Sequence, residues 1–386
     1  MDSKEKIIEI MLKENDTNNI LKELTDNNLL NEFDFSNDCC KKNYIEEKDT
    51  LYKYIKYKLS NIETINFEYE RTRVLKENLE NSNENKIPDA DSKSKVLQLI
   101  YNKLYKEFLE DEDFKRIVTN KNNNIYGDTM NSVSTTLNEA INRILKANKA
   151  DELDQIKNAI YYGIVDGSIE DIREELNSFK LPGWNCSIIY TTELYLNYDK
   201  NLRRKGISNF SLKKYLERIG AFKLIEVYHA LGNFIIIPKG WNKCRYSSLK
   251  DYWDLTLLCI YNYYFKIEDE KYCIEKISGK ENKEQYEVYI NTFESWEKFI
   301  KANFLESFVE IEKDENGKYS YGKPKELWEG HFEGELLPTN IYQCIDYFNN
   351  SSEWIKLRTE LMIEYLKYVM NKEIVLNKIY NLQKEH

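Results

Sequence analysis

The first part of the chain repeats apolar residues at the spacing of amphipathic helices. Ile7, Ile8 and Met11 form one such set, and Leu51 and Ile55 belong to another. Apolar positions three and four residues apart lie on one face of a helix. This pattern predicts that the chain begins with a helical region.

Two polar stretches interrupt the apolar pattern. Residues 81–89 and 120–124 are rich in Asn and poor in apolar side chains. Stretches of this composition are typical of loops or linkers between structural units. We therefore expect a helical N-terminal region over residues 1–120 and a core domain over residues 125–386.

The core domain is predicted to be mostly α, within the α+β class. Two β-rich runs lie within residues 224–238, on either side of Gly232-Asn233, which favours a β-hairpin or a short sheet there. Other segments read as helices. One begins near Ser134, with Asp128 or Ser132 as its cap, a second begins at Ser247 or Ser248 and carries Trp253, and closing helices lie within 354–384.

Composition narrows the class of protein. The chain has 386 residues, of which 41% are hydrophobic and 32% charged, enough apolar material for a folded core. Its seven cysteines show no C-x-x-C spacing, and no apolar stretch follows the first residues as a signal peptide would require. We expect a soluble, cytoplasmic protein with reduced thiols and no membrane partner.

The net charge of −10 excludes a polycation built for nucleic acid, but one stretch is locally basic. Residues 201–223 hold seven Lys or Arg against one Glu, a net of +6. Arg203, Arg204, Lys213 and Lys214 are candidates for contacts with nucleic-acid phosphates. The alternative is a lysine-rich helix surface without a ligand.

Several enzyme classes lack their motifs in this chain. With 13 glycines in all, the sequence has no glycine-rich phosphate loop of the Walker or dinucleotide-binding type. It also has no Gly-x-Ser-x-Gly elbow, which disfavours a serine hydrolase of that fold.

The densest group of rare and polar residues lies within 228–254. A hairpin followed by a helix is the frame in which a His deprotonates water, an Asn orients that His, and helix-borne carboxylates hold a divalent metal such as Mg²⁺ on a scissile phosphate. The candidates for base, orienting residue, metal ligands and phosphate clamp are, in that order, His229, Asn233 or Asn242, Asp251 with Asp254, and Arg245. The same residues equally suit a helix cap, core aromatics and turn chemistry.

A second polar cluster combines a His with several carboxylates. It comprises Glu326, Glu329, His331, Glu333 and Glu335. Such a set is suited to a metal ion, but the two glycines within it favour a solvated acidic loop.

Two resemblances concern these segments. Residues 229–234 with Asn242 and Lys250-Asp251-Tyr252 resemble the end of the HNH-like domain of GmrD-type restriction endonucleases, although no His precedes His229 in this chain. Over about residues 125–360, the chain resembles an uncharacterised family from low-GC Gram-positive bacteria. The segments that carry this second resemblance are 126–132, 229–238, 251–255 and 326–332.

Two classes of function follow from these observations. The HNH resemblance implies a nucleic-acid-directed effector, a metal-dependent phosphodiesterase acting in defence against mobile elements. The alternative is a non-enzymatic helical interaction or scaffold protein that binds a protein partner or a second copy of itself.

Overall fold

The computed structural model describes residues 101–161, 216–366 and 379–381, except positions 103, 122, 148 and 229. Of these residues, 60% are helical and 10% lie in strands, which confirms the mostly α fold class. The basic stretch up to residue 215 and the predicted helices before residue 101 lie outside this described part.

In the described part of the chain, helices are interspersed with the short strands of two small sheets. The helices are α7 (Glu112–Val118), α8 (Val133–Lys146), α9 (Ala150–Tyr161), α13 (Ala221–Val227), α14 (Trp241–Leu249), α15 (Trp253–Phe265), α16 (Ile274–Ser278), α17 (Lys283–Asn291), α18 (Trp296–Ala302) and α19 (Ile341–Leu366). The strands are β1 (Gly127–Thr129), β2 (Phe234–Ile236), β3 (Val309–Lys313) and β4 (Tyr319–Pro324).

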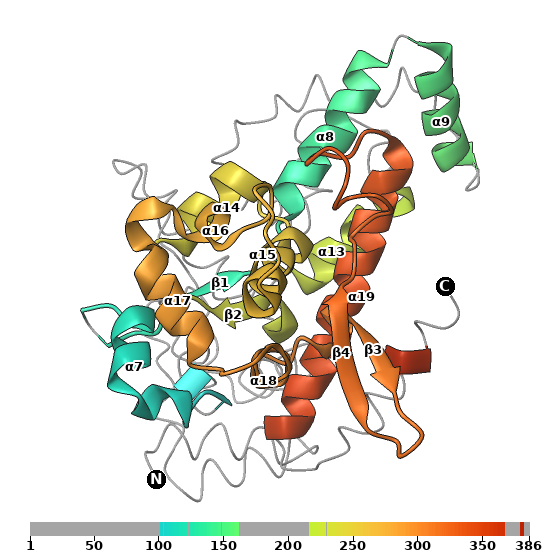
Figure 1. Ribbon diagram of the computed structural model, residues 1–386. Helices are drawn as coiled ribbons and strands as arrows, with labels where there is room; N and C mark the ends of the chain where they lie inside the picture. The colour runs from blue at the N-terminus through green and yellow to red at the C-terminus, as the bar shows by residue number, and fades with distance from the viewer. Residues whose placement is uncertain are drawn as a thin grey trace, which may run out of the picture.

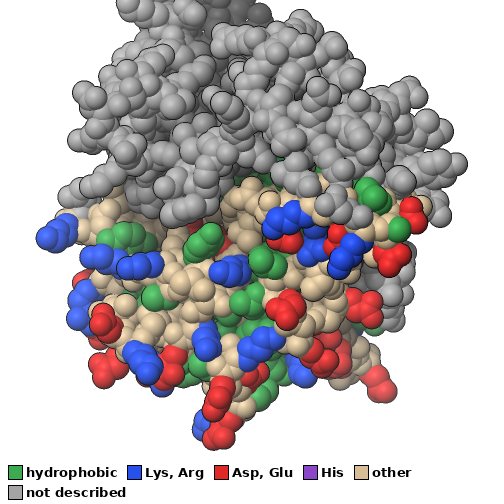
Figure 2. Space-filling model, turned by 90° about the horizontal axis from the view of Figure 1, so that it is seen from above, with side chains coloured by type: hydrophobic (Ala, Val, Ile, Leu, Met, Phe, Trp, Pro, Cys, Tyr) green, Lys and Arg blue, Asp and Glu red, His purple; other side chains and the backbone are tan. Residues whose placement is uncertain are grey.

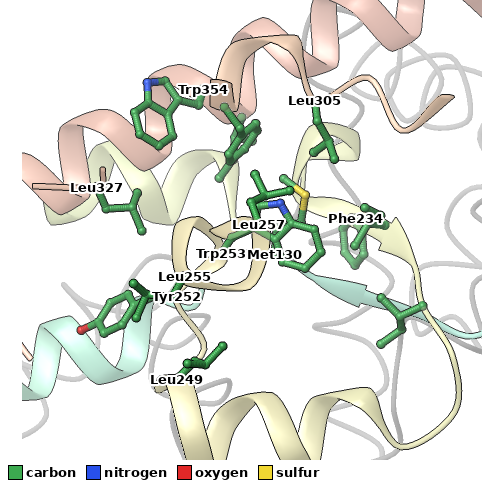
Figure 3. Packing of buried hydrophobic residues seen from close by; sticks show 14 of the residues in the cluster. Met130, Phe234, Leu249, Tyr252, Trp253, Leu255, Leu257, Leu305, Leu327 and Trp354 are labelled. Atoms are coloured by element: carbon green, nitrogen blue, oxygen red, sulfur yellow. The ribbon is translucent and has the colours of Figure 1, made fainter. Parts of the chain in front are cut away.

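Helix α15 forms the centre of the fold. Residues 253–257 are all buried, so the first turn of this helix has no face exposed to solvent, as is typical of a helix surrounded by protein. Figure 1 shows α14, α16 and α17 on one side of it and α13 and the long helix α19 on the other. The side chains of Trp253 and Met130 lie together in the middle of the core (Figure 3), so the start of α15 contacts the segment that follows β1.

The sheet near residues 224–238 forms, but the hairpin prediction is wrong. Strand β2 pairs antiparallel with β1, in the register Gly127↔Ile236 and Thr129↔Phe234. The run before the turn is helix α13, because Leu224 and Val227 are buried at helical spacing rather than in alternation. Gly232 and Asn233 belong to the 3-10 helix η5 (Leu231–Asn233).

The single helix predicted from Ser247 or Ser248 is two helices. Helix α14 already begins at Trp241 and ends at Leu249, and the next helix, α15, begins at Trp253. Lys250 and Asp251 adopt left-handed φ angles of 56° and 71° at this break. Two successive residues in the left-handed conformation end a right-handed helix. The periodicity of apolar residues does not indicate backbone conformations of this kind, so the sequence predicted one helix.

Other local predictions fare differently. Ser132 is the N-cap of α8, and its Oγ accepts a hydrogen bond from the Ser134 N–H at 3.4 Å, as expected. The closing helix α19 begins at Ile341, earlier than predicted. The turn around Asp314–Gly317 joins β3 to β4, and the Asp314 carboxylate accepts from the Asn316 and Lys318 N–H groups.

Residues before position 120 belong to the same core as the later helices. The Phe114 ring stacks on Tyr289 at 5.6 Å, and the Tyr105 hydroxyl donates to Asn303 Oδ1 at 3.1 Å. The domain boundary between residues 120 and 125 stays a prediction, but it does not coincide with an edge of the hydrophobic cluster.

Among the helices of the described ranges, none has both the length and the apolar character that crossing a bilayer demands.

Candidate functional site

Asn233 fastens the segment after β1 to the turn before β2. Its Nδ2 donates to the Asn131 carbonyl at 3.1 Å and to the Tyr228 carbonyl at 2.8 Å, while its Oδ1 accepts from the Asn131 N–H at 3.0 Å. The side chain is fully buried. Asn131 in turn accepts a bond from the Trp253 N–H at the first residue of α15. Asn233 therefore joins the segments around Asn131 and Tyr228 through their backbone groups, and the Asn131 side chain extends the connection to the start of α15.

Arg245 lies at the centre of the same network. From helix α14, its Nη1 donates to the Met130 carbonyl at 3.0 Å, and its Nη2 donates to the Thr129 carbonyl at 3.1 Å. Nη2 also lies 2.7 Å from Asp251 Oδ1 and 3.3 Å from Asp128 Oδ2. The guanidinium carbon lies 5.3 Å from the centre of the Trp253 ring, and Arg245 is 1% exposed. All of these contacts of the guanidinium are therefore with groups inside the protein. A planar group with five donors suits such a buried junction.

The break between α14 and α15 gives Asp251 its position. The left-handed backbone at Lys250 and Asp251 turns the chain so that the Asp251 carboxylate and its carbonyl both contact Arg245. Burial raises the pKa of Asp251, and the charge of Arg245 opposes that rise. The backbone strain at these two residues is offset by the contacts that it permits.

Asp254 and His331 form a second buried pair. His331 Nδ1 lies 2.6 Å from Asp254 Oδ2, and both side chains are 0% exposed. The same carboxyl group accepts the Leu327 N–H at 2.9 Å and the Leu255 N–H at 2.8 Å. Because a carboxylate only accepts, the proton of this bond belongs to His331 Nδ1. Nε2, at the other end of the ring, has no hydrogen-bond partner.

Aromatic rings enclose the imidazole of His331. It stacks on Trp328 with ring centres 3.5 Å apart, and the Tyr252 ring meets it edge-on at 5.1 Å. The loop around it is fixed by Glu326, whose carboxylate accepts the N–H groups of Gly330 and Phe332. The expectation of a wholly solvated acidic loop is thus wrong for His331, although Glu329, Glu333 and Glu335 are exposed.

The predicted site residues divide into three groups. Asn233, Arg245, Asp251 and Asp254 all lie in the buried network at the start of α15. Asn242 is exposed on α14, away from the contacts of this network. His229, Arg203, Arg204, Lys213 and Lys214 lie outside the described residues.

Sequence reasoning missed Arg358 of helix α19. Its Nη1 donates to the carbonyls of Gly232 and Phe234 at 2.7 and 2.8 Å, and its Nε donates to the Asn303 carbonyl at 3.0 Å. Arg358 is fully buried. The only signal in the sequence was rarity, since arginine occurs ten times against many lysines.

The described residues do not fit the expected magnesium site. No group of three or more His, Cys, Asp or Glu side chains within them is placed to hold a metal ion. Asp254 already accepts three hydrogen bonds, and Asp251 is paired with Arg245. Both carboxylates are therefore committed to partners within the protein.

Comparison of the chain with protein-family models, curated proteins and solved structures gives no match. The four segments singled out in the sequence nevertheless meet in one place. Residues 128–131, 233, 245–254 and 326–331 contribute to a continuous set of buried hydrogen bonds and ion pairs around the first turn of α15. These segments therefore contribute hydrogen bonds and ion pairs to one part of the core.

Proposed function

We propose that the chain is a non-enzymatic helical interaction or scaffold protein of the cytoplasm. One observation carries this proposal: Arg245, the side chain best suited to clamp a phosphate, is buried and makes its contacts inside the protein. A group used in this way supports a rigid framework rather than a ligand.

The surface supports the same function. Large apolar side chains with at least 40% exposure are Tyr246, Phe265, Ile267, Val288, Tyr342 and Tyr365. Exposed aromatic residues are the usual anchors of protein interfaces. On the face shown in Figure 2, Lys and Arg are interspersed with Asp and Glu, unlike the single-sign face expected of a nucleic-acid binder. The four described cysteines are free thiols, which suits a reducing compartment.

Self-association of the purified full chain tests this function. We expect sedimentation velocity to show a species heavier than one chain, with a proportion that rises with concentration. Phe265→Ser should weaken the association, and Lys243→Ser, an exposed change on α14, serves as the matched control. A chain that stays monomeric and binds no protein in co-purification would contradict the proposal.

A second function, hydrolysis directed at nucleic acid, is favoured by the Asp254–His331 pair. A carboxylate that fixes one nitrogen of an imidazole leaves the other available as a general base. His331 Nε2 has no hydrogen-bond partner, but the side chain is fully buried, so a substrate would reach it only after a local opening of the structure. Such an effector would serve in defence against mobile elements.

A nuclease assay separates the two functions. Labelled single- and double-stranded DNA and RNA are incubated with the purified chain, with Mg²⁺ and with a chelator. Cleavage that is lost in His331→Gln and retained in Glu329→Gln would establish the hydrolytic function. Absence of cleavage by the wild-type chain favours the interaction protein.

A further inference from the structure

Helix α14 carries lysines and no carboxylates. Among the α-helices of the described residues, α14 is the one without an Asp or Glu, although the whole chain has 66 of them. No acidic residue occurs between Glu226 and Asp251. The exposed side of this helix therefore differs in charge from a protein whose net charge is −10.

Three lysines form this basic face. Lys239 precedes the helix, Lys243 lies in its first turn, and Lys250 follows its last residue. Lys239 and Lys243 are exposed, and Lys250 is half-buried. Within the described ranges, none of the three Nζ atoms has a carboxylate oxygen within 4.0 Å, whereas Lys301 on helix α18 pairs with Glu297 at 2.7 Å. The basic face thus presents three ammonium groups that are not used in ion pairs of the described protein.

The fourth cation of this segment is neutralised inside the protein. Arg245 is buried, and its Nη2 lies 2.7 Å from Asp251 Oδ1. The positive end of the helix dipole adds to the charge of the lysines, because the cap residue is Gly240 and no side chain caps the first turn. Helix α14 therefore has an ion pair on its buried side and unpaired lysines on its exposed side.

The other side chains of the face are uncharged. Asn242 and Tyr246 are exposed between the lysines. An amide donates hydrogen bonds to carboxylates, and exposed aromatic residues are common anchors of protein interfaces. Residues 274–283, on and after the neighbouring helix α16, mix three Lys with two Glu, so the basic face is confined to α14 and its ends.

We propose that the basic face binds a short acidic segment of a partner protein, an assignment that rests on the interaction function proposed above and names its partner. With a rise of about 1.5 Å per residue, Lys243 and Lys250 are about 10 Å apart along the helix. Side chains on one side of an extended peptide are about 7 Å apart. Asp or Glu at every second position of the peptide therefore comes within reach of successive lysines and forms charge-assisted hydrogen bonds with them.

Nucleic acid fits this face less well. Proteins that bind it strongly make about 6–10 phosphate contacts, whereas the basic face has three lysines. The net charge of −10 also repels a long polyanion more than a short peptide. The observations favour a protein segment with a few carboxylates.

Binding of an acidic peptide by the purified full chain tests the proposal. The probe is a fluorescent peptide of alternating Asp and Gly, and its binding is followed by fluorescence anisotropy at several salt concentrations. A peptide of alternating Asn and Gly and a fluorescent oligothymidylate are the comparison probes. We expect the wild-type chain to bind the Asp peptide in preference to both, and to bind it more weakly as salt rises. This result requires no variant.

Charge reversal locates the site. Lys239→Glu combined with Lys243→Glu should weaken binding of the Asp peptide by at least about tenfold, because two attractions become repulsions. Lys318→Glu combined with Lys323→Glu makes the same change in net charge at two exposed positions beside and on β4, and is the matched control. No binding of the Asp peptide, equal losses in the two double variants, or preference for oligothymidylate would overturn the proposal.

Sedimentation velocity of the same proteins separates this proposal from the proposed function. Self-association that persists in the Lys239 and Lys243 double variant, while peptide binding is lost, supports the acidic partner. A wild-type chain that self-associates without binding the Asp peptide overturns this proposal and leaves the interaction function standing. If the double variant loses self-association as well, the basic face binds a second copy of the chain, and the proposed partner is wrong.

Discussion

His331 Nδ1 and Asp254 Oδ2 lie 2.6 Å apart although 77 residues separate them in the chain. This contact joins the first turn of α15 to the loop between β4 and α19. Because neither side chain is exposed, water cannot replace either partner when the other is removed.

We therefore predict strong coupling between these two residues. Asp254→Asn and His331→Gln should each lower the free energy of unfolding by about 1–3 kcal/mol, the usual cost of a buried polar group without a partner. The double variant should lose less than the sum of the two. Urea unfolding of all four proteins measures this, with the exposed Glu329→Gln as control; additive losses would show that the pair does not act as a unit.

Arg245→Met is predicted to be among the most damaging single changes in the described core. It removes the partner of Asp251 and leaves the carbonyls of Thr129 and Met130 without a donor. Breaking a buried pair in this way costs about 3–5 kcal/mol. Lys243→Met, on the exposed side of the same helix, should change the melting temperature little; equal effects of the two changes would contradict the buried role of Arg245.

Gly232→Ala should destabilise the protein because helix α19 passes too close for a side chain. An added Cβ would collide with the Ile355 carbonyl oxygen and the Thr359 side chain. Overpacking of this kind costs about 1–3 kcal/mol or more. Gly330→Asn is a suitable control, since nothing lies within 4 Å there and Asn tolerates its left-handed backbone. A stable Gly232→Ala protein would show that η5 and α19 are farther apart.

Lys325 predicts a specific dependence of stability on pH. Its pKa is about 7 in the folded chain and has the ordinary value of 10.5 when the chain is unfolded. Between these values the unfolded state binds more protons, so this residue makes stability rise with pH over that window. Below pH 7 the full penalty for the buried ammonium is present.

The difference between wild type and Lys325→Met isolates this contribution. Urea unfolding at pH 7 and pH 9 should show the wild-type chain gaining stability relative to the variant as pH rises. Lys323→Met should show no such change. A constant difference between Lys325→Met and wild type at both values would mean that Lys325 titrates normally.

Local structural features could be predicted from the sequence, but the tertiary contacts of each segment could not. The Ser132 cap and the mostly α composition follow from nearest neighbours along the chain. Leu224 to Val227 fit a strand equally well in isolation, and helix α13 forms because its buried face packs on α8 and α19. Tertiary contacts decided between the two.

The candidate site shows the same division. The sequence singled out Asn233, Arg245, Asp251 and Asp254, and the structure places all four in one network. The spacing of these residues along the chain did not show that each of them binds buried groups of the protein itself. Asp254 meets His331 from another segment, and Arg358 reaches Gly232 from 126 residues away, beyond any local periodicity.

Helix α19 has a consequence for how the protein is made. Arg358 supplies hydrogen bonds to Gly232, Phe234 and Asn303, all of which leave the ribosome earlier. Until Arg358 itself has emerged, these carbonyls lack their donor and the apolar surface around β2 lacks its cover. The described core therefore closes only after α19 has been synthesised, and until then the apolar surface around β2 stays exposed. We expect a chain truncated before Arg358 to leave these three carbonyls without their donor and the core open.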